Sequence, residues 1–175
     1  MTLETISVSK LMNRKVQTDF EDQNIMSACN IMYTNDIGSV IIVTRNEDRA
    51  PTGIITERDI VQILGRLNPD LLITPLKTLM SRPLITIEES ASMTDASKLM
   101  NTKKIRRLVV VDRYNKMSGI LTQKDIFRAI DKNPKLFSEF YGEAFSSKFK
   151  EIYEKFNQYR LESLMPEFNQ YRLED

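Results

Sequence analysis

The sequence predicts a mixed α/β fold (α+β) made of two repeats, each with the order strand, helix, strand, strand, helix, and a helical C-terminal extension. Two observations predict it: one pattern of apolar and polar residues occurs twice, and each copy contains a turn of the form Gly-x-x-Thr-x-x-Asp. We expect the copies to pack as one module with a pseudo-two-fold axis. The predicted segments are a first repeat at 1–67, a linker at 68–74, a second repeat at 75–133 and the extension at 134–175.

The two copies align over most of their length. Leu11-Met12 aligns with Leu79-Met80, 68 residues later, and the aliphatic run 40–43 aligns with 108–111 at the same spacing. Beyond these runs the spacing falls to 66, because the first copy has two extra residues within 45–52. A loop tolerates such an insertion, so the change in spacing predicts a loop between two strands.

Each copy is expected to form the same elements, since its apolar residues change from helical to strand spacing at matching places. Asp22 and Ser90 are the expected N-caps of the first helix in each copy. The expected elements are an extended piece at 15–18 or 83–87, a helix at 23–33 or 93–101, a strand at 37–43 or 105–111, a second strand at 53–55 or 119–121, and a closing helix from 56 or 122.

The turns 53–59 and 119–125 are the candidate functional feature of each repeat. Thr56 and Thr122 stand where a helix begins, and Asp59 and Asp125 follow in the first helical turn. Each turn therefore offers a hydroxyl, a carboxylate and backbone N–H groups that are free at a helix start. These groups can simply cap a helix, or they can hold a ribose and a phosphate.

Composition excludes several classes of function. The chain of 175 residues has a net charge of +1, so no overall positive field favours nucleic acid or an acidic membrane. Without histidine there is no Ser-His or Cys-His nucleophile pair and no His-ligated metal, which argues against an enzyme. The single cysteine, Cys29, the lack of a signal peptide pattern and the shortness of the aliphatic runs predict a cytoplasmic protein that does not span a membrane.

The Leu-Met pairs, the strand 105–112 and the two Gly-x-x-Thr-x-x-Asp turns together resemble a tandem pair of cystathionine β-synthase-type (CBS) domains, known as a Bateman module. The resemblance covers roughly residues 5 to 132. It implies a stand-alone, non-enzymatic regulatory module that binds an adenine nucleotide (AMP, ADP or ATP, with Mg²⁺ as an optional companion) or a related adenosyl ligand in clefts between the repeats.

The turn residues suit such a ligand. A carboxylate can accept two hydrogen bonds from a ribose diol, the threonine hydroxyl and helix-start N–H groups can donate to phosphate, and Ile54-Ile55 or Ile120-Leu121 can line an apolar slot for a base. The resemblance implies the same roles and puts adenine near the extended pieces, which also carry Leu84. The candidate ligand-binding residues are Val16, Thr18, Ile37, Gly38, Ile55, Thr56, Arg58, Asp59, Thr86, Ile105, Arg106, Arg107, Leu121, Thr122, Lys124 and Asp125.

The resemblance also implies that each repeat supplies phosphate-binding residues to the other. It directs Arg106, Arg107 and Lys124 toward the Asp59 turn, and Gly38, Ser39 and Arg58 toward the Asp125 turn. The expected result is an asymmetric pair of sites in which the Asp59 site binds phosphate more strongly. The alternative is that Arg106 and Arg107 alternate across a strand, one in a surface ion pair and the other solvated.

The extension is rich in aromatic residues. Tyr141, Phe145, Phe149, Tyr153 and Phe156 follow one another at helical spacing and predict one aromatic stripe. Such a stripe must be covered, by its own module or its mate in a homodimer, or by a regulated partner protein. The segment 156–162 recurs as 168–174, and we have no physical account of this duplication. A second hypothesis is a ligand-independent dimerisation or adaptor scaffold in which the turns are only helix caps.

Overall fold

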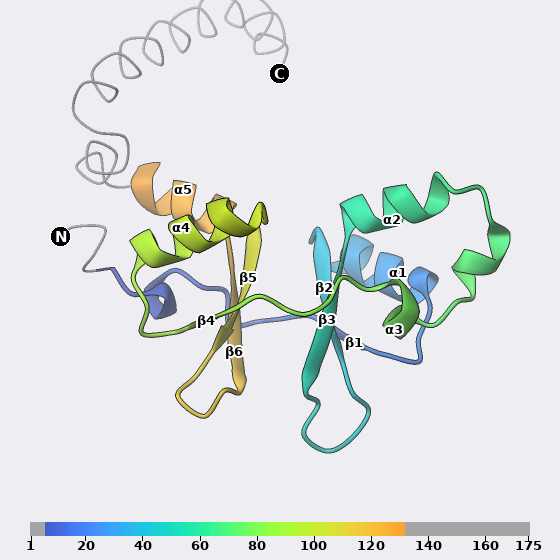
Figure 1. Cartoon of the computed structure of the whole chain (residues 1–175), viewed down its shortest axis with the longest axis horizontal. Helices are drawn as coiled ribbons and strands as arrows, with labels where there is room; N and C mark the ends of the chain where they lie inside the picture. The colour runs from blue at the N-terminus through green and yellow to red at the C-terminus, as the bar shows by residue number, and fades with distance from the viewer. Residues whose placement is uncertain (1–5, 132–175) are drawn as a thin grey trace, which may run out of the picture. The chain divides into compact units, whose positions relative to one another are not determined.

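The computed structural model describes residues 6–131, and the predictions for the extension at 134–175 lie outside the described residues. The predicted fold class and element order are confirmed (Figure 1). The elements are η2 (Val8–Lys10), β1 (Thr18–Phe20), α1 (Ile25–Asn35), β2 (Ser39–Val43), β3 (Pro51–Thr56), α2 (Glu57–Leu64), η3 (Pro69–Leu72), α3 (Leu76–Leu79), β4 (Thr86–Glu88), α4 (Met93–Lys103), β5 (Arg107–Val111), β6 (Met117–Thr122) and α5 (Gln123–Asp131).

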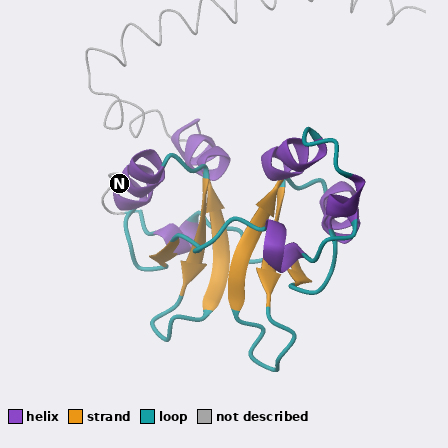
Figure 2. Ribbon diagram, turned by 45° about the vertical axis from the view of Figure 1, so that its right-hand side comes forward, coloured by secondary structure: helices purple, strands orange, loops and turns teal. Residues whose placement is uncertain are grey.

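The strands form two three-stranded sheets of the same topology, β1-β2-β3 and β4-β5-β6. In each sheet the first two strands are parallel and the last two antiparallel. The parallel pair needs a crossover, which α1 or α4 supplies, whereas a hairpin joins the antiparallel pair. Both sheets belong to one compact unit that spans Glu4–Phe127, and helices lie on their outer sides (Figure 2).

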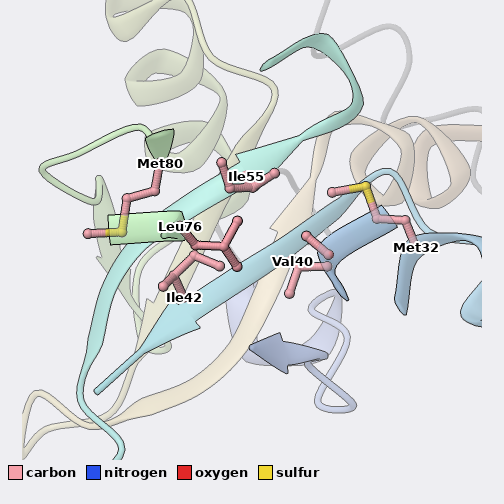
Figure 3. Packing of buried hydrophobic residues seen from close by; sticks show 7 residues of the cluster. Met32, Val40, Ile42, Ile55, Leu76 and Met80 are labelled. Carbon is pink, nitrogen blue, oxygen red and sulfur yellow. The ribbon is translucent and has the colours of Figure 1, made fainter. Parts of the chain in front are cut away.

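The middle strand of each sheet is buried on both faces, which explains why it reads as a continuous aliphatic run. Val40 and Ile42 pack on the helix side of the first sheet with Leu76 and Met80 (Figure 3). Residues on the opposite face, Ile41, Val43 and Val109, join the two sheets in a second cluster. The two repeats therefore share a core, and residues that alternate with the helix-side ones face the other repeat.

The short segments that precede each repeat are exchanged between the repeats. Before the first repeat, the chain runs along the second, where the Val8 N–H donates to the Ala91 carbonyl at 2.8 Å and Asn13 exchanges two backbone hydrogen bonds with Ile120. Before the second repeat, Ser81 pairs in the same way with Ile54 of the first. The boundaries at 67, 74 and 133 that we took from the sequence repeat stay a prediction, because backbone hydrogen bonds join residues on both sides of the first two and the third lies outside the described residues.

This exchange explains the glycine that opens each turn motif. A Cβ on Gly119 would lie 2.6 Å from the Met12 sulfur and 3.0 Å from the Asn13 carbonyl oxygen. A Cβ on Gly53 would overlap the Met80 side chain in the same way. Each glycine is thus needed for the close approach of the exchanged segment, and a ligand is not required to explain it.

The N-caps predicted at Asp22 and Ser90 are wrong by two residues. Asn24 caps α1, where its Oδ1 accepts from the Met26 and Ser27 N–H groups at 3.0 and 3.3 Å. Ser92 caps α4 in a capping box with Asp95. Asp22 instead forms an ion pair with Arg45 at 2.9 Å, and this carboxylate is therefore occupied elsewhere. No helix within residues 6–131 combines the length and apolar character that crossing a membrane needs.

Candidate functional site

The two Thr-Asp turns have nearly identical geometry and confirm the predicted cap. Thr56 is the N-cap of α2, and its backbone N–H and its hydroxyl donate to Asp59 Oδ2 at 2.8 and 2.7 Å. The Asp59 N–H donates back to Thr56 Oγ1 at 3.3 Å. Thr122 and Asp125 repeat the three bonds at 2.9, 2.6 and 3.3 Å. Each turn is a capping box with aspartate in the place of the usual glutamate.

The cap uses some of the groups that a ligand was expected to find free. The N–H of Glu57 donates to the Gly38 carbonyl at 3.2 Å, and that of Gln123 donates to the Arg106 carbonyl at 3.0 Å. With the N–H of each aspartate bonded to its threonine, two N–H groups at each helix start are engaged. The prediction of free backbone donors is therefore wrong for these groups, because the closed turn satisfies them.

Asp59 keeps part of its hydrogen-bonding capacity. Its Oδ2 accepts two hydrogen bonds from Thr56, and its Oδ1 accepts one from the Ser81 hydroxyl at 3.2 Å. A carboxylate has about four acceptor positions, so Oδ1 can accept one more without any rearrangement. A ribose diol that uses both positions of Oδ1 must displace the Ser81 hydroxyl. The sequence pattern did not single out Ser81, because the exchanged segment brings it to the turn from outside the motif.

Arg107 is the charged residue that the second repeat contributes to the Asp59 turn. It opens β5 two residues before Val109, so its side chain projects from the face that meets the first repeat. A Cβ on Gly38 would lie 2.6 Å from the Arg107 Nη2 and 2.5 Å from the Glu57 Oε2. Burial lowers the pKa of the Arg107 guanidinium, the charge of Arg106 lowers it further, and Glu57 and Asp59 raise it. Arg107 therefore stays charged beside two carboxylates.

The other predicted cations are more exposed to solvent than Arg107. Arg106, Arg58 and Lys124 are exposed, whereas Arg107 is half-buried. The charge of Arg106 acts on the pKa of Arg107, so the two guanidinium groups are near each other. At the aligned position of the first repeat, Ser39 begins β2 in place of Arg107, and it supplies no charge to the Asp125 turn. Of the three cations predicted for the Asp59 turn, Arg107 is the one whose charge is shown to interact with Asp59, and the placement of Arg106 and Lys124 there stays a prediction.

The apolar residues of the prediction divide into two groups. Ile55 and Leu121 are 0% exposed, and Ile55 packs in the helix-side core of the first repeat, so neither side chain lines an open slot for a base. Ile54 and Ile120, on the opposite face of the same strands, contact the cluster between the sheets, as do Val16 and Leu84. Four other predicted residues are half-buried: Thr18, Ile37, Gly38 and Ile105. Thr86 is exposed.

A pocket lies apart from the turns. It has a volume of about 320 Å³ and lies where β4 and β5 end, whereas Arg107 and Thr122 lie where β5 begins. None of the predicted site residues lines it. Its lining residues are Glu88, Glu89, Ser90, Asp112, Arg113 and Tyr114.

Comparison with known proteins identifies the repeats. The family model of the CBS domain matches twice, at residues 8–66 and 76–132. An uncharacterized protein of Methanopyrus kandleri is 40% identical over 128 residues, which are 72% of this chain and 63% of that protein. The chain spans less than two thirds of the length of the first curated relatives that it matches, with shares of 63%, 39% and 22%.

Solved structures share the same architecture. The CBS domain pair of protein MJ0100, in complex with 5′-methylthioadenosine and S-adenosyl-L-methionine, has a TM-score of 0.64 and 27% identity over 73% of this chain and 97% of that chain. A CBS domain protein of Pyrobaculum aerophilum complexed with AMP has a TM-score of 0.67 and 24% identity over 76% and 99% of the two chains, a likeness that concerns the fold. The chain therefore belongs to the CBS domain family and carries two CBS domains in tandem.

Proposed function

We propose that this CBS pair is a regulatory module, and not an enzyme, that binds an adenine nucleotide or a related adenosyl ligand at its Thr-Asp turns. The observation that carries the proposal is the convergence of Thr56 and Asp59 from one repeat with Arg107 from the other. A diol acceptor, a hydroxyl and a guanidinium form a set that suits a ribose 5′-phosphate. Relatives in complex with AMP, or with S-adenosyl-L-methionine and 5′-methylthioadenosine, support the same class of ligand.

The roles follow from the remaining capacity of each group. Asp59 Oδ1 accepts from a ribose hydroxyl, and the Ser81 hydroxyl turns away when both ribose hydroxyls bind. Arg107 donates to the phosphate, and the apolar residues between the sheets, such as Ile54 and Val16, contact the base. Since the ligand would touch both repeats, binding favours one relative arrangement of them. A regulated protein that distinguishes the two arrangements would read the signal.

The two turns are proposed to differ in their preference for phosphate. Arg107 lies at the Asp59 turn, whereas Ser39 occupies the aligned position for the Asp125 turn. A half-buried cation that donates to a phosphate contributes about 1 kcal/mol or more at the effective dielectric of a protein. We therefore expect AMP, ADP or ATP, the last with Mg²⁺, to favour the Asp59 site. The Asp125 site is expected to depend less on the charge of the ligand.

Calorimetric titration of the purified protein with AMP, ADP, ATP, NAD and S-adenosylmethionine tests the proposal. For at least one of these ligands, Asp59→Ala is expected to weaken binding tenfold or more, because the diol acceptor is lost. Asp95→Ala is the matched control, since it removes the same kind of capping aspartate from α4, away from the turns. If Asp59→Ala and Asp95→Ala lower stability alike but leave every affinity unchanged, the turns are helix caps only.

A second candidate function, a homodimeric scaffold, has an observation of its own. Val61 on α2 and Phe127 on α5 are 68% and 53% exposed and occupy aligned positions of the two repeats. Leu64, on the same helix as Val61, is also exposed. Exposed apolar residues at an aligned position of both repeats suit a second copy of the chain, because a two-fold interface uses the same surface twice. Native mass spectrometry measures the mass of the assembly and detects any co-purified nucleotide. If the protein is a dimer without bound nucleotide, and calorimetry shows that it binds none, the scaffold function is favoured.

The proposed function includes a location in the cytoplasm. A chain with the single cysteine Cys29 forms no internal disulfide, which suits a reducing compartment. A sensor of free adenine nucleotides would meet its ligand there.

A further inference from the structure

The Glu57 carboxylate and the Arg107 guanidinium lie next to each other over Gly38. Glu57 Oε2 and Arg107 Nη2 lie 2.5 and 2.6 Å from the point where a Cβ on Gly38 would be. The two groups are therefore about 5 Å apart or closer, a range in which unit charges interact appreciably at a protein surface. They come from different repeats and meet over a residue that has no side chain.

The backbone explains why Glu57 points to this place. Glu57 is the first residue of α2, and its N–H donates to the Gly38 carbonyl at 3.2 Å. That hydrogen bond holds the start of the helix against Gly38, so the Glu57 side chain extends over the glycine. Any larger residue at position 38 would displace both charged groups, since a Cβ there would be closer to each than atoms normally approach.

Glu57 and Arg107 are neighbours without a closed ion pair. By contrast, Asp22 and Arg45 do reach ion-pair distance, at 2.9 Å. Glu57 is exposed, whereas Arg107 is half-buried. The carboxylate can therefore swing into solvent at little cost, while the guanidinium stays where it is.

The second repeat provides a natural comparison. Gln123 is the residue of α5 that aligns with Glu57, and its N–H donates to the Arg106 carbonyl at 3.0 Å as that of Glu57 does to Gly38. The backbone geometry is thus the same, but the side chain is neutral. A carboxylate at this position is not needed to start the helix.

From this arrangement we propose that Glu57 is a specificity-determining residue that competes with the ligand's phosphate for Arg107. The inference rests on the proposed function of the Asp59 site. A phosphorylated ligand must displace the carboxylate and tolerate its charge, whereas an adenosyl ligand without phosphate can bind while Glu57 remains beside Arg107. Arg107 alone would make the site bind AMP more tightly than adenosine. Glu57 reduces this difference in affinity, because it weakens the binding of AMP and not that of adenosine.

Calorimetry with AMP and with adenosine on the full chain and on Glu57→Gln tests this role. Removal of one repelling charge at a partly solvated site is expected to strengthen AMP binding about threefold to tenfold and to leave adenosine binding unchanged. Gln123→Glu is the matched control, because it adds the same charge at the aligned position of the other turn while Glu57 stays in place, and it is expected to leave the AMP-to-adenosine ratio at the Asp59 site unchanged. In an Arg107→Met background, Glu57→Gln should change that ratio less, because the competition for the guanidinium is lost and only the direct repulsion of the phosphate remains.

The outcomes separate the two proposals. If the wild-type protein binds none of AMP, adenosine, ADP, ATP, NAD and S-adenosylmethionine, the proposed function fails and the role of Glu57 fails with it. If AMP and adenosine both bind, and Glu57→Gln leaves the ratio of their affinities unchanged while its melting temperature matches that of the wild type, the role of Glu57 is wrong and the proposed function stands.

Discussion

Replacing Asp19 by isoleucine is expected to stabilise the protein. Asp19 lies in the middle of β1, is 7% exposed, and is the buried charged residue of the described core. Its Oδ1 accepts from the adjacent Phe20 N–H at 2.8 Å, but its Oδ2 is buried without a hydrogen-bond partner. The aligned residue of the second repeat is Ile87, which is buried in β4 in the same register. The first repeat therefore carries a carboxylate where the second shows that isoleucine fits.

The size of the effect follows from the unpaired oxygen. A buried polar atom without a partner costs about 1–3 kcal/mol, and more for a charged group. The extra apolar area of isoleucine adds a gain that imperfect packing around a larger side chain can offset by about 1–3 kcal/mol. We therefore expect Asp19→Ile to raise the free energy of unfolding by about 1–3 kcal/mol, the range set by the oxygen. At about 2–4 °C for each kcal/mol in a chain of this size, the melting temperature should rise by about 2–12 °C.

Urea unfolding monitored by circular dichroism, with the melting temperature as a second readout, measures this change. Asp19→Asn separates charge from shape and is expected to give a smaller gain, because an amide at this depth still lacks a full set of partners. Ile87→Asp is the reverse change in the second repeat and should destabilise by several kcal/mol. An Asp19→Ile protein that is less stable than wild type, with an unchanged dependence on urea, would refute the reasoning and show that the carboxylate has a favourable partner.

Two further predictions concern the packing of the exchanged segments and an exposed ion pair. Gly119→Ala is expected to destabilise the protein more than Gly53→Ala. A Cβ at position 119 meets a backbone oxygen at 3.0 Å that cannot rotate away, whereas a Cβ at position 53 meets a flexible methionine side chain. Urea unfolding of both variants measures the two losses in stability, and equal losses would contradict this reasoning. The hydrogen bond from Arg45 lowers the pKa of Asp22 below its ordinary 3.8, so the stabilisation from this carboxylate is present above its unfolded pKa and is lost as pH falls through the folded one. Carboxyl NMR titration should show this pKa rising toward the ordinary value in Arg45→Ala, and an unchanged pKa would rule the ion pair out.

The repeat and its element order could be predicted because both depend on local signals. The aliphatic runs and the Thr-Asp turns each lie within a few residues, and the turns do cap helices as expected. The N-caps predicted for α1 and α4 are wrong because each region offers two capping residues, and at α1 a nonlocal partner decides between them. Asp22 binds Arg45, 23 residues away, which leaves Asn24 to cap the helix.

The exchange of the lead-in segments could not be read from the repeat, because the register shows which residues correspond and not which residues touch. Ser81 reaches Asp59 only through this exchange, and the side chains of Ile55 and Leu121 could be assigned to a face only once the helix layer was known. Alternation places one residue of each aliphatic pair toward the other repeat, but it does not say which one.

The site itself shows most clearly why a single repeat is not enough to predict function. Within one copy, Thr56 and Asp59 form a closed cap, and the same is true of Thr122 and Asp125, so neither turn indicates a preference for a ligand. The proposed difference between the two sites comes from the residue that begins the middle strand of the opposite repeat, Arg107 in β5 and Ser39 in β2. Since a change in one repeat alters the site of its neighbour, the two turns can diverge in ligand preference while each retains an intact cap. In the proposed module, ligand preference at the Asp59 turn is therefore a property of the pair, and it should respond to substitutions at the start of β5 more than to substitutions inside the cap.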